Sequence, residues 1–147
     1  MSSLPAGWVA STVGAVWELK YGKSLPEKAR QSGDFVVYGS NGPVGTHTDP
    51  LTAGPTIVIG RKGSIGELHF SPQPCFPIDT TYFIDEFGGC EPAFVALLMR
   101  SLPLKTMNRA TAIPGLNRQD AYDLEVAVPP LAEQRRIVAK LDALTTR

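Results

Sequence analysis

The stretch from Gly54 to Phe70 constrains this chain more than any other part of its sequence. Thr56 to Ile59 is a short, mostly β-branched apolar run, which predicts a buried strand. From Ser64 to Phe70 the pattern shifts toward alternation of apolar and polar residues, as expected of a half-buried strand. Between the two lies Gly60-Arg61-Lys62-Gly63, in which glycines permit a tight turn and two cations suit a phosphate backbone. An ordinary hairpin tip with solvated charges is the alternative interpretation.

Length and composition limit what the chain can be. Its 147 residues are enough for one domain with its own core. Lys and Arg number 14, as do Asp and Glu, so no overall positive field indicates nucleic-acid binding. The two cysteines, Cys75 and Cys90, lack metal-ligand spacing, and so few of them predict a cytoplasmic protein. Because no apolar run reaches membrane-spanning length and the N-terminus lacks signal-peptide features, we expect no membrane partner.

Charge is distributed unevenly along the chain. Residues 64–99 contain acids but no Lys or Arg, whereas residues 100–118 contain basic residues and no acid. A neutral protein with basic loops of this kind can still present one positive face. Scattered surface charge produces a similar sequence pattern, so both interpretations stay open.

The remaining pattern predicts a mixture of strands and short helices. Strands are expected at 35–38, 76–84 and 124–128, and a short helix within 13–19. Pro92 predicts the start of a helix that Pro103 ends. A final helix is expected from Leu131, and its apolar spacing suits either packing on its own domain or a coiled coil.

Two segments are candidate binding loops. The pair Asn41-Gly42 follows an expected strand and is typical of a tight turn with positive φ, although the Asn41 amide could equally read a base edge. The segment 104–118 is long and dense in hydrogen-bond donors, as binding loops often are. Within it, Asn117 is also a candidate N-cap for a short helix through 122.

The sequence lacks a recognisable catalytic constellation. His47 and His69 have no nucleophile motif nearby, and with Asp49 they do not show the spacing of a metal site. We therefore expect no catalytic residue, no metal and no cofactor bound by this chain. A metal-dependent nuclease or hydrolase using His47, Asp49, His69 or Asp79 is one alternative. The other is a KH-like module that binds single-stranded RNA through Gly60–Gly63, although a KH loop joins two helices.

Six motifs follow one another along the chain: Leu4-Pro-Ala-Gly-Trp8, Tyr38-Gly-Ser-Asn-Gly42, Gly60-Arg-Lys-Gly-Ser-Ile-Gly66, Pro77-Ile-Asp-Thr-Thr81, Thr111-Ala-Ile-Pro-Gly-Leu-Asn117 and Pro129-Pro-Leu-Ala-Glu-Gln134. In this order they resemble one known family, the specificity subunit of type I restriction-modification systems. The resemblance implies an α+β target recognition domain at 1–130, with a curved, barrel-like mixed sheet and few flanking helices. Residues 131–147 would begin a long spacer or dimerisation helix. Members of this family carry two such domains, so this chain is expected to be a half-subunit, a truncated gene product or an excised fragment.

The resemblance implies a protein that binds DNA without catalysing a reaction. A specificity subunit reads duplex DNA and docks methyltransferase subunits, which bring S-adenosylmethionine, while a restriction and motor subunit cuts unmodified DNA. This chain is expected to read one half of a bipartite site. Its expected partners are double-stranded DNA, the methyltransferase subunit, the restriction subunit, and either a second copy of itself or a second recognition domain.

Residue chemistry assigns expected roles within that function. Arg61 and Lys62 would neutralise phosphates and set the register, and donors on the loops would read base edges. The helix from Leu131 would dock a partner through Ile137, Leu141 and Leu144. The residues expected to contact DNA are Tyr21, Lys23, Ser40, Asn41, Arg61, Lys62, Ser64, Lys105, Asn108, Arg109, Thr111, Asn117 and Arg118.

Overall fold

The structure, a computed structural model, describes residues 4–107 and 115–145. Its elements alternate between short strands and short helices. In chain order they are β1 (Val9–Thr12), α1 (Val13–Val16), β2 (Lys20–Tyr21), the 3-10 helix η1 (Glu27–Ala29), β3 (Phe35–Gly39), β4 (Gly42–His47), β5 (Thr56–Gly60), β6 (Leu68–Ser71), β7 (Cys75–Pro77), β8 (Thr81–Ile84), α2 (Pro92–Ser101), the 3-10 helix η2 (Leu104–Thr106), α3 (Arg118–Tyr122), β9 (Glu125–Val128) and α4 (Leu131–Thr145).

The central sheet has the strand order β2-β8-β5-β6, with antiparallel neighbours. All five residues of β5 are buried, as its continuous apolar run predicts. Its partner β6 begins only at Leu68, because residues 61–67 form the turn that follows β5. The expectation of a strand from Ser64 is therefore wrong for its first four residues.

A second sheet has the order β4-β3-β7, in which β3 pairs antiparallel with β4 and parallel with β7. The single strand expected at 76–84 is in fact two strands, β7 and β8, which belong to different sheets. Between them, the N–H and the hydroxyl of Thr81 both donate to the Ile78 carbonyl, at 3.0 and 2.7 Å. This turn lets the chain leave one sheet and enter the other.

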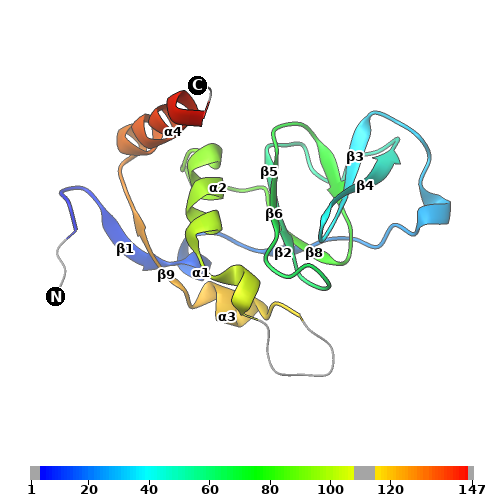
Figure 1. The fold of residues 1–147 in the computed structure, drawn as a ribbon, viewed down its shortest axis with the longest axis horizontal. Coiled ribbons are helices and arrows are strands. Elements are labelled where there is room, and N and C mark those ends of the chain that lie inside the picture. The colour runs from blue at the N-terminus through cyan, green and yellow to red at the C-terminus, as the bar shows by residue number, and fades with distance from the viewer. Residues whose placement is uncertain (1–3, 108–114, 146–147) are drawn as a thin grey trace.

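A third, two-stranded sheet joins the beginning of the chain to its end. Strands β1 and β9 pair antiparallel, with Val9 opposite Val128 and Thr12 opposite Glu125. Figure 1 shows this ribbon at one end of the molecule, the sheets at the other end, and α2 between them. Sequence patterning does not predict β1, because its four residues alternate too weakly to indicate a strand.

One hydrophobic core joins the central sheet, β9 and the helices α1, α2 and α3. The mixed strand pairing and the few helices confirm the α+β class. Within the described residues the sheets stay separate and do not close into a barrel. No helix in the described part of the chain is long and apolar enough to cross a membrane. The core includes Val13, Trp17, Leu19, Ile57, Ile59, Ile84, Val95, Met99, Leu116, Ala121 and Val126.

The final helix, α4, packs beside α2, and a buried polar side chain fixes its start (Figure 1). Gln134 is only 3% exposed. Its amide accepts a hydrogen bond from the N–H of Glu91, the residue that caps α2, at 2.8 Å. The same amide donates to the Pro129 carbonyl at 2.9 Å. Gln134 therefore occupies a position on the inner face of α4 where an apolar residue would otherwise pack, and it ties the two helices together.

Replacing Gln134 with alanine should destabilise the fold. The change leaves the Glu91 N–H and the Pro129 carbonyl without their partner, which costs about 1–3 kcal/mol of unfolding free energy. Urea unfolding followed by circular dichroism measures the loss. The exposed Lys140 on the same helix supplies the control, since Lys140→Ala should change stability by less than about 0.5 kcal/mol. Equal losses in the two variants would contradict the assigned role of Gln134.

Candidate nucleic-acid interface

The basic turn Gly60–Gly66 is fixed by its own backbone and by the neighbouring strand connection. The N–H groups of Arg61 and Lys62 both donate to the Thr80 carbonyl, at 2.9 and 3.1 Å. The Gly66 N–H donates back to the Gly60 carbonyl at 2.9 Å. A Cβ at Gly60 would lie 1.9 Å from the Ser64 carbonyl oxygen, so only glycine allows this closure. The two adjacent cations thus project from a rigid turn.

Arg61 is held against two tyrosine rings. Its Nη2 donates to the Asp79 carbonyl. Its guanidinium carbon lies 5.3 Å from the centre of the Tyr21 ring and 5.9 Å from that of Tyr82. The two rings pair across β2 and β8, with centroids 5.2 Å apart. Cation–π attraction of this kind orients the arginine without neutralising its charge.

Arg118 reaches the same cluster from the other end of the chain. Its guanidinium carbon lies 4.7 Å from the Tyr21 ring centre and 5.6 Å from that of Tyr122. Its Nη1 donates to the Leu19 carbonyl at 3.3 Å. Within the described residues, neither Arg61 nor Arg118 has a carboxylate at ion-pair distance. Two like charges are therefore held close together by aromatic rings.

Hydrogen bonds join the segment that carries Arg118 to the basic turn. The Leu116 N–H donates to the Arg61 carbonyl at 2.8 Å, and Lys62 forms a bridge with Gly115. The Tyr82 hydroxyl donates to the Leu116 carbonyl at 2.7 Å. Burial raises the pKa of Tyr82 to about 12, helped by the nearby Tyr21 and opposed by Arg61 and Arg118. A neutral tyrosine thus keeps this donor in place at physiological pH.

The hairpin between β3 and β4 lies against the same turn. The Ser64 N–H donates to the Ser40 hydroxyl at 3.4 Å. Ser40 and Asn41 are the two residues between the paired Gly39 and Gly42, and Asn41 is exposed. Positive φ, 114°, occurs at Gly42 as the first residue of β4, so the expected turn centred on Asn41-Gly42 is shifted by one residue. Asn41 is therefore free of backbone strain and stands at the tip of the hairpin.

The structure brings together six of the residues expected to contact DNA: Tyr21, Ser40, Arg61, Lys62, Ser64 and Arg118. The backbone of Lys23 lies near the connection between β7 and β8, because its N–H donates to the Pro77 carbonyl. The same connection contains Thr80, which accepts from the N–H groups of Arg61 and Lys62. The side chains of Lys23 and Lys62 are on exposed residues. Their roles in DNA binding stay predictions. We call the exposed Tyr21 ring, with the Arg61 and Arg118 guanidinium groups over it, the Tyr21–Arg61–Arg118 face.

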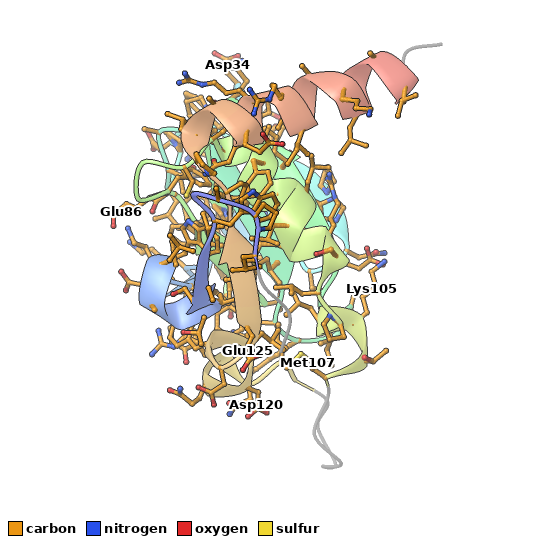
Figure 2. The ribbon with its side chains drawn as sticks, turned by 90° about the vertical axis from the view of Figure 1, so that its left-hand side faces the viewer. Asp34, Glu86, Lys105, Met107, Asp120 and Glu125 are labelled. Carbon is orange, nitrogen blue, oxygen red and sulfur yellow. The ribbon has the colours of Figure 1, made fainter. Side chains whose placement is uncertain are left out.

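Two other predicted residues have structural partners. The Asn117 side chain accepts from the Asp120 N–H at 2.9 Å, so Asn117 is the N-cap of α3. Lys105 lies in η2, whose backbone comes close to Gly66. Its Nζ forms an ion pair with Glu67 at 3.4 Å. Figure 2 shows Lys105 at the edge of the molecule opposite Glu86. Asn108, Arg109 and Thr111 lie outside the described residues.

The alternative functions find little support in the described residues. Gly60–Gly63 follows β5 and leads to β6, so it does not join two helices as a KH loop must. No group of three or more His, Cys, Asp and Glu side chains in the described residues is arranged to hold a metal ion. His47 accepts from the Gln31 N–H and packs edge-on against Phe76, whereas His69 packs beside Tyr38.

Sequence reasoning missed Tyr82 and Tyr122 as parts of the face. From the sequence alone, Tyr82 is interpreted as an ordinary core aromatic residue in a strand, and Tyr122 as the end of a short helix. Their contribution depends on which cations the fold places over their rings, and local sequence carries no signal of that. The pairing of Tyr21 with Tyr82 across β2 and β8 is equally a product of strand register.

Tyr82 should make stability depend on alkaline pH. Its pKa in the folded protein, about 12, exceeds the ordinary value of 10.0, so its contribution is complete below about pH 10. The contribution is then lost as pH rises toward 12. Tyr82→Phe should lower the unfolding free energy by about 1 kcal/mol near neutral pH and remove this part of the alkaline loss. Urea unfolding across the alkaline range measures both effects.

Tyr38→Phe is the matched control, because the Tyr38 hydroxyl makes no hydrogen bond within the described residues. It should leave the stability at neutral pH close to that of the parent protein. An unchanged alkaline slope in Tyr82→Phe would show that Tyr82 does not carry the effect.

The fold is similar to solved structures of restriction-modification proteins. A type I restriction-modification S subunit from M. genitalium superposes with a TM-score of 0.80 at 18% identity, covering 99% of this chain and 41% of that chain. An HsdS subunit from Thermoanaerobacter tengcongensis gives 0.74 at 21% identity, with 99% and 39% covered. A third structure, from work on assembly and conformational transition of the type I R-M system, gives 0.77 at 22% identity, with 99% and 40% covered. The chain spans about two fifths of the length of the three solved structures.

Sequence comparison identifies the family. No curated protein matches it at a significant level. The family described as "Type I restriction modification DNA specificity domain" matches residues 5–147, nearly the whole chain. The chain therefore belongs to the type I restriction-modification DNA specificity domain family.

Proposed function

We propose that this chain reads one half of a bipartite sequence in double-stranded DNA, as the recognition module of a type I restriction-modification complex. The observation that carries the proposal is the Tyr21–Arg61–Arg118 face, where neither arginine has an acidic partner in the described residues. The exposed Asn41 follows Ser40, whose hydroxyl accepts from Ser64 in the basic turn that carries Arg61. Cations of this kind bind phosphates, and amide side chains read adenine edges. Because the formal net charge of the chain is zero, DNA binding must depend on this local surface and not on an overall positive field.

The chain itself does no bond chemistry in this proposal. Methylation and cleavage belong to partner subunits, and S-adenosylmethionine binds to the methyltransferase subunit. Residues 1–130 form the recognition domain, and 131–147 begin the spacer helix. Support for docking along α4 comes from Leu141 and Leu144, which are 38% and 54% exposed. A groove of about 440 Å³ between α2 and α4, lined in part by Leu97 and Val138, offers an adjoining apolar surface.

Selection from random duplexes tests sequence recognition. The chain, mixed with its methyltransferase subunit, should enrich one short sequence, and its affinity should fall steeply with salt because phosphate contacts release counterions. Steep salt dependence without any enriched sequence would reduce the protein to a nonspecific DNA binder. Preference for single-stranded over duplex ligands would overturn the proposal.

Two substitutions should separate phosphate contacts from base reading. Lys62→Ala should weaken binding to all duplexes alike, with the slope of log affinity against log salt reduced by about 0.9. Asn41→Ala should instead relax discrimination at one base pair by about 1–3 kcal/mol while keeping the salt slope. Lys140→Ala on α4 is the charge-matched control for Lys62→Ala and should leave both quantities unchanged. A reduced salt slope in Asn41→Ala, together with relaxed base discrimination in Lys62→Ala, would show that the two residues have the opposite roles.

If α4 docks a partner, a substitution on its apolar edge should impair association with that partner without impairing DNA binding. Leu144→Asp should weaken association with the methyltransferase subunit or a second copy of the chain, because it places a charge in an apolar contact. Duplex binding by the chain alone should be unaffected. Analytical ultracentrifugation of the chain, alone and with the methyltransferase subunit, measures the association. Unchanged association in both mixtures would remove α4 from the docking surface.

A further inference from the structure

The Tyr21 ring stands where two arginines converge from distant parts of the chain. Arg61 follows β5 and Arg118 begins α3, and both lie within 5.3 Å of the centre of this one ring. By these two distances, 5.3 and 4.7 Å, the guanidinium carbons are at most 10.0 Å apart. Tyr21 itself is 52% exposed, so the shared ring is at the surface.

Bringing two guanidinium groups together costs repulsion that acids usually offset. No carboxylate among the described residues pairs with either group. Each arginine instead donates to one backbone carbonyl, that of Asp79 or of Leu19. The Nε of Arg61 is enclosed without an acceptor in the described residues. The pair is oriented by rings and carbonyls but not neutralised, which favours an anion in front of it.

We infer that Tyr21 is a positioning residue that holds Arg61 and Arg118 as a two-arginine clamp for a short stretch of phosphates in one DNA strand. The inference rests on the proposed function, because it names the part of DNA that this face grips. A Tyr ring suits the task, since its face attracts a cation without cancelling the charge. Planar guanidinium groups stack on such a ring, and they bind phosphate oxygens in a bidentate manner.

Salt dependence distinguishes a clamp from direct contact of Tyr21 with DNA. Each phosphate contact contributes about 0.9 to the slope of log affinity against log salt. Arg61→Ala and Arg118→Ala should each reduce the slope by about this amount. Tyr21→Leu removes no charge, yet in the clamp it removes the one ring that both arginines share and should reduce the slope by up to about 1.8. Tyr21→Phe keeps the ring and should keep the slope.

The measurement uses the full chain and a duplex of mixed sequence, with circular dichroism to establish that each variant is folded. Tyr21→Met provides the same test if Tyr21→Leu does not fold. Weaker binding by the leucine variant at an unchanged salt slope would mean that the ring contacts DNA directly, and would overturn the clamp. Binding and slope equal to those of the parent protein would overturn it as well.

A second readout needs no DNA. Ring currents from Tyr21 should shift the δ-methylene proton signals of Arg61 and Arg118 upfield, and Tyr21→Leu should move both sets toward random-coil positions. Signals that stay in place would overturn the clamp whatever the DNA result. Failure of sequence enrichment in the duplex selection, with these shifts and slopes as expected, would overturn only the proposed sequence recognition. The two hypotheses can therefore fail separately.

Discussion

The position of the basic turn depends on the burial of β5. This strand is hydrogen-bonded to β8 on one side and β6 on the other, and all five of its residues are buried. Its end at Gly60 is therefore fixed by the core. The Thr80 carbonyl, just before β8, then accepts the next two N–H groups of the chain. The direction in which Arg61 and Lys62 leave the molecule is thus a consequence of core packing.

Aromatic rings rather than acids organise the charge on this face. Where the chain uses ordinary ion pairs, as between Lys20 and Asp85 at 2.8 Å, the cation is compensated, and the hydrogen bond to Asp85 raises the pKa of Lys20. On the Tyr21–Arg61–Arg118 face, tyrosines supply orientation without compensation. This difference explains how a chain with zero net charge can present a surface suited to a polyanion.

The two ends of the chain are joined to the core by different means. The ribbon of β1 and β9 places the segment that follows residue 4 beside the segment that leads into α4. Gln134 then ties the first turn of α4 to the cap of α2. Further along the helix, Leu141 and Leu144 are 38% and 54% exposed. The start of α4 therefore belongs to the folded body, whereas its later turns present an apolar edge outward.

The sequence by itself determined the local elements: β5 from its apolar run, α2 between its prolines, and α3 from the Asn117 cap. These depend on residues close together in the chain. Its ordered motifs also indicated the family that comparison confirms. Only the tertiary structure decided that residues 76–84 divide between two sheets and that β1 pairs with β9. It alone decided that Arg61 and Arg118, 57 positions apart in the chain, share one tyrosine ring, because strand register and helix placement carry no local signature.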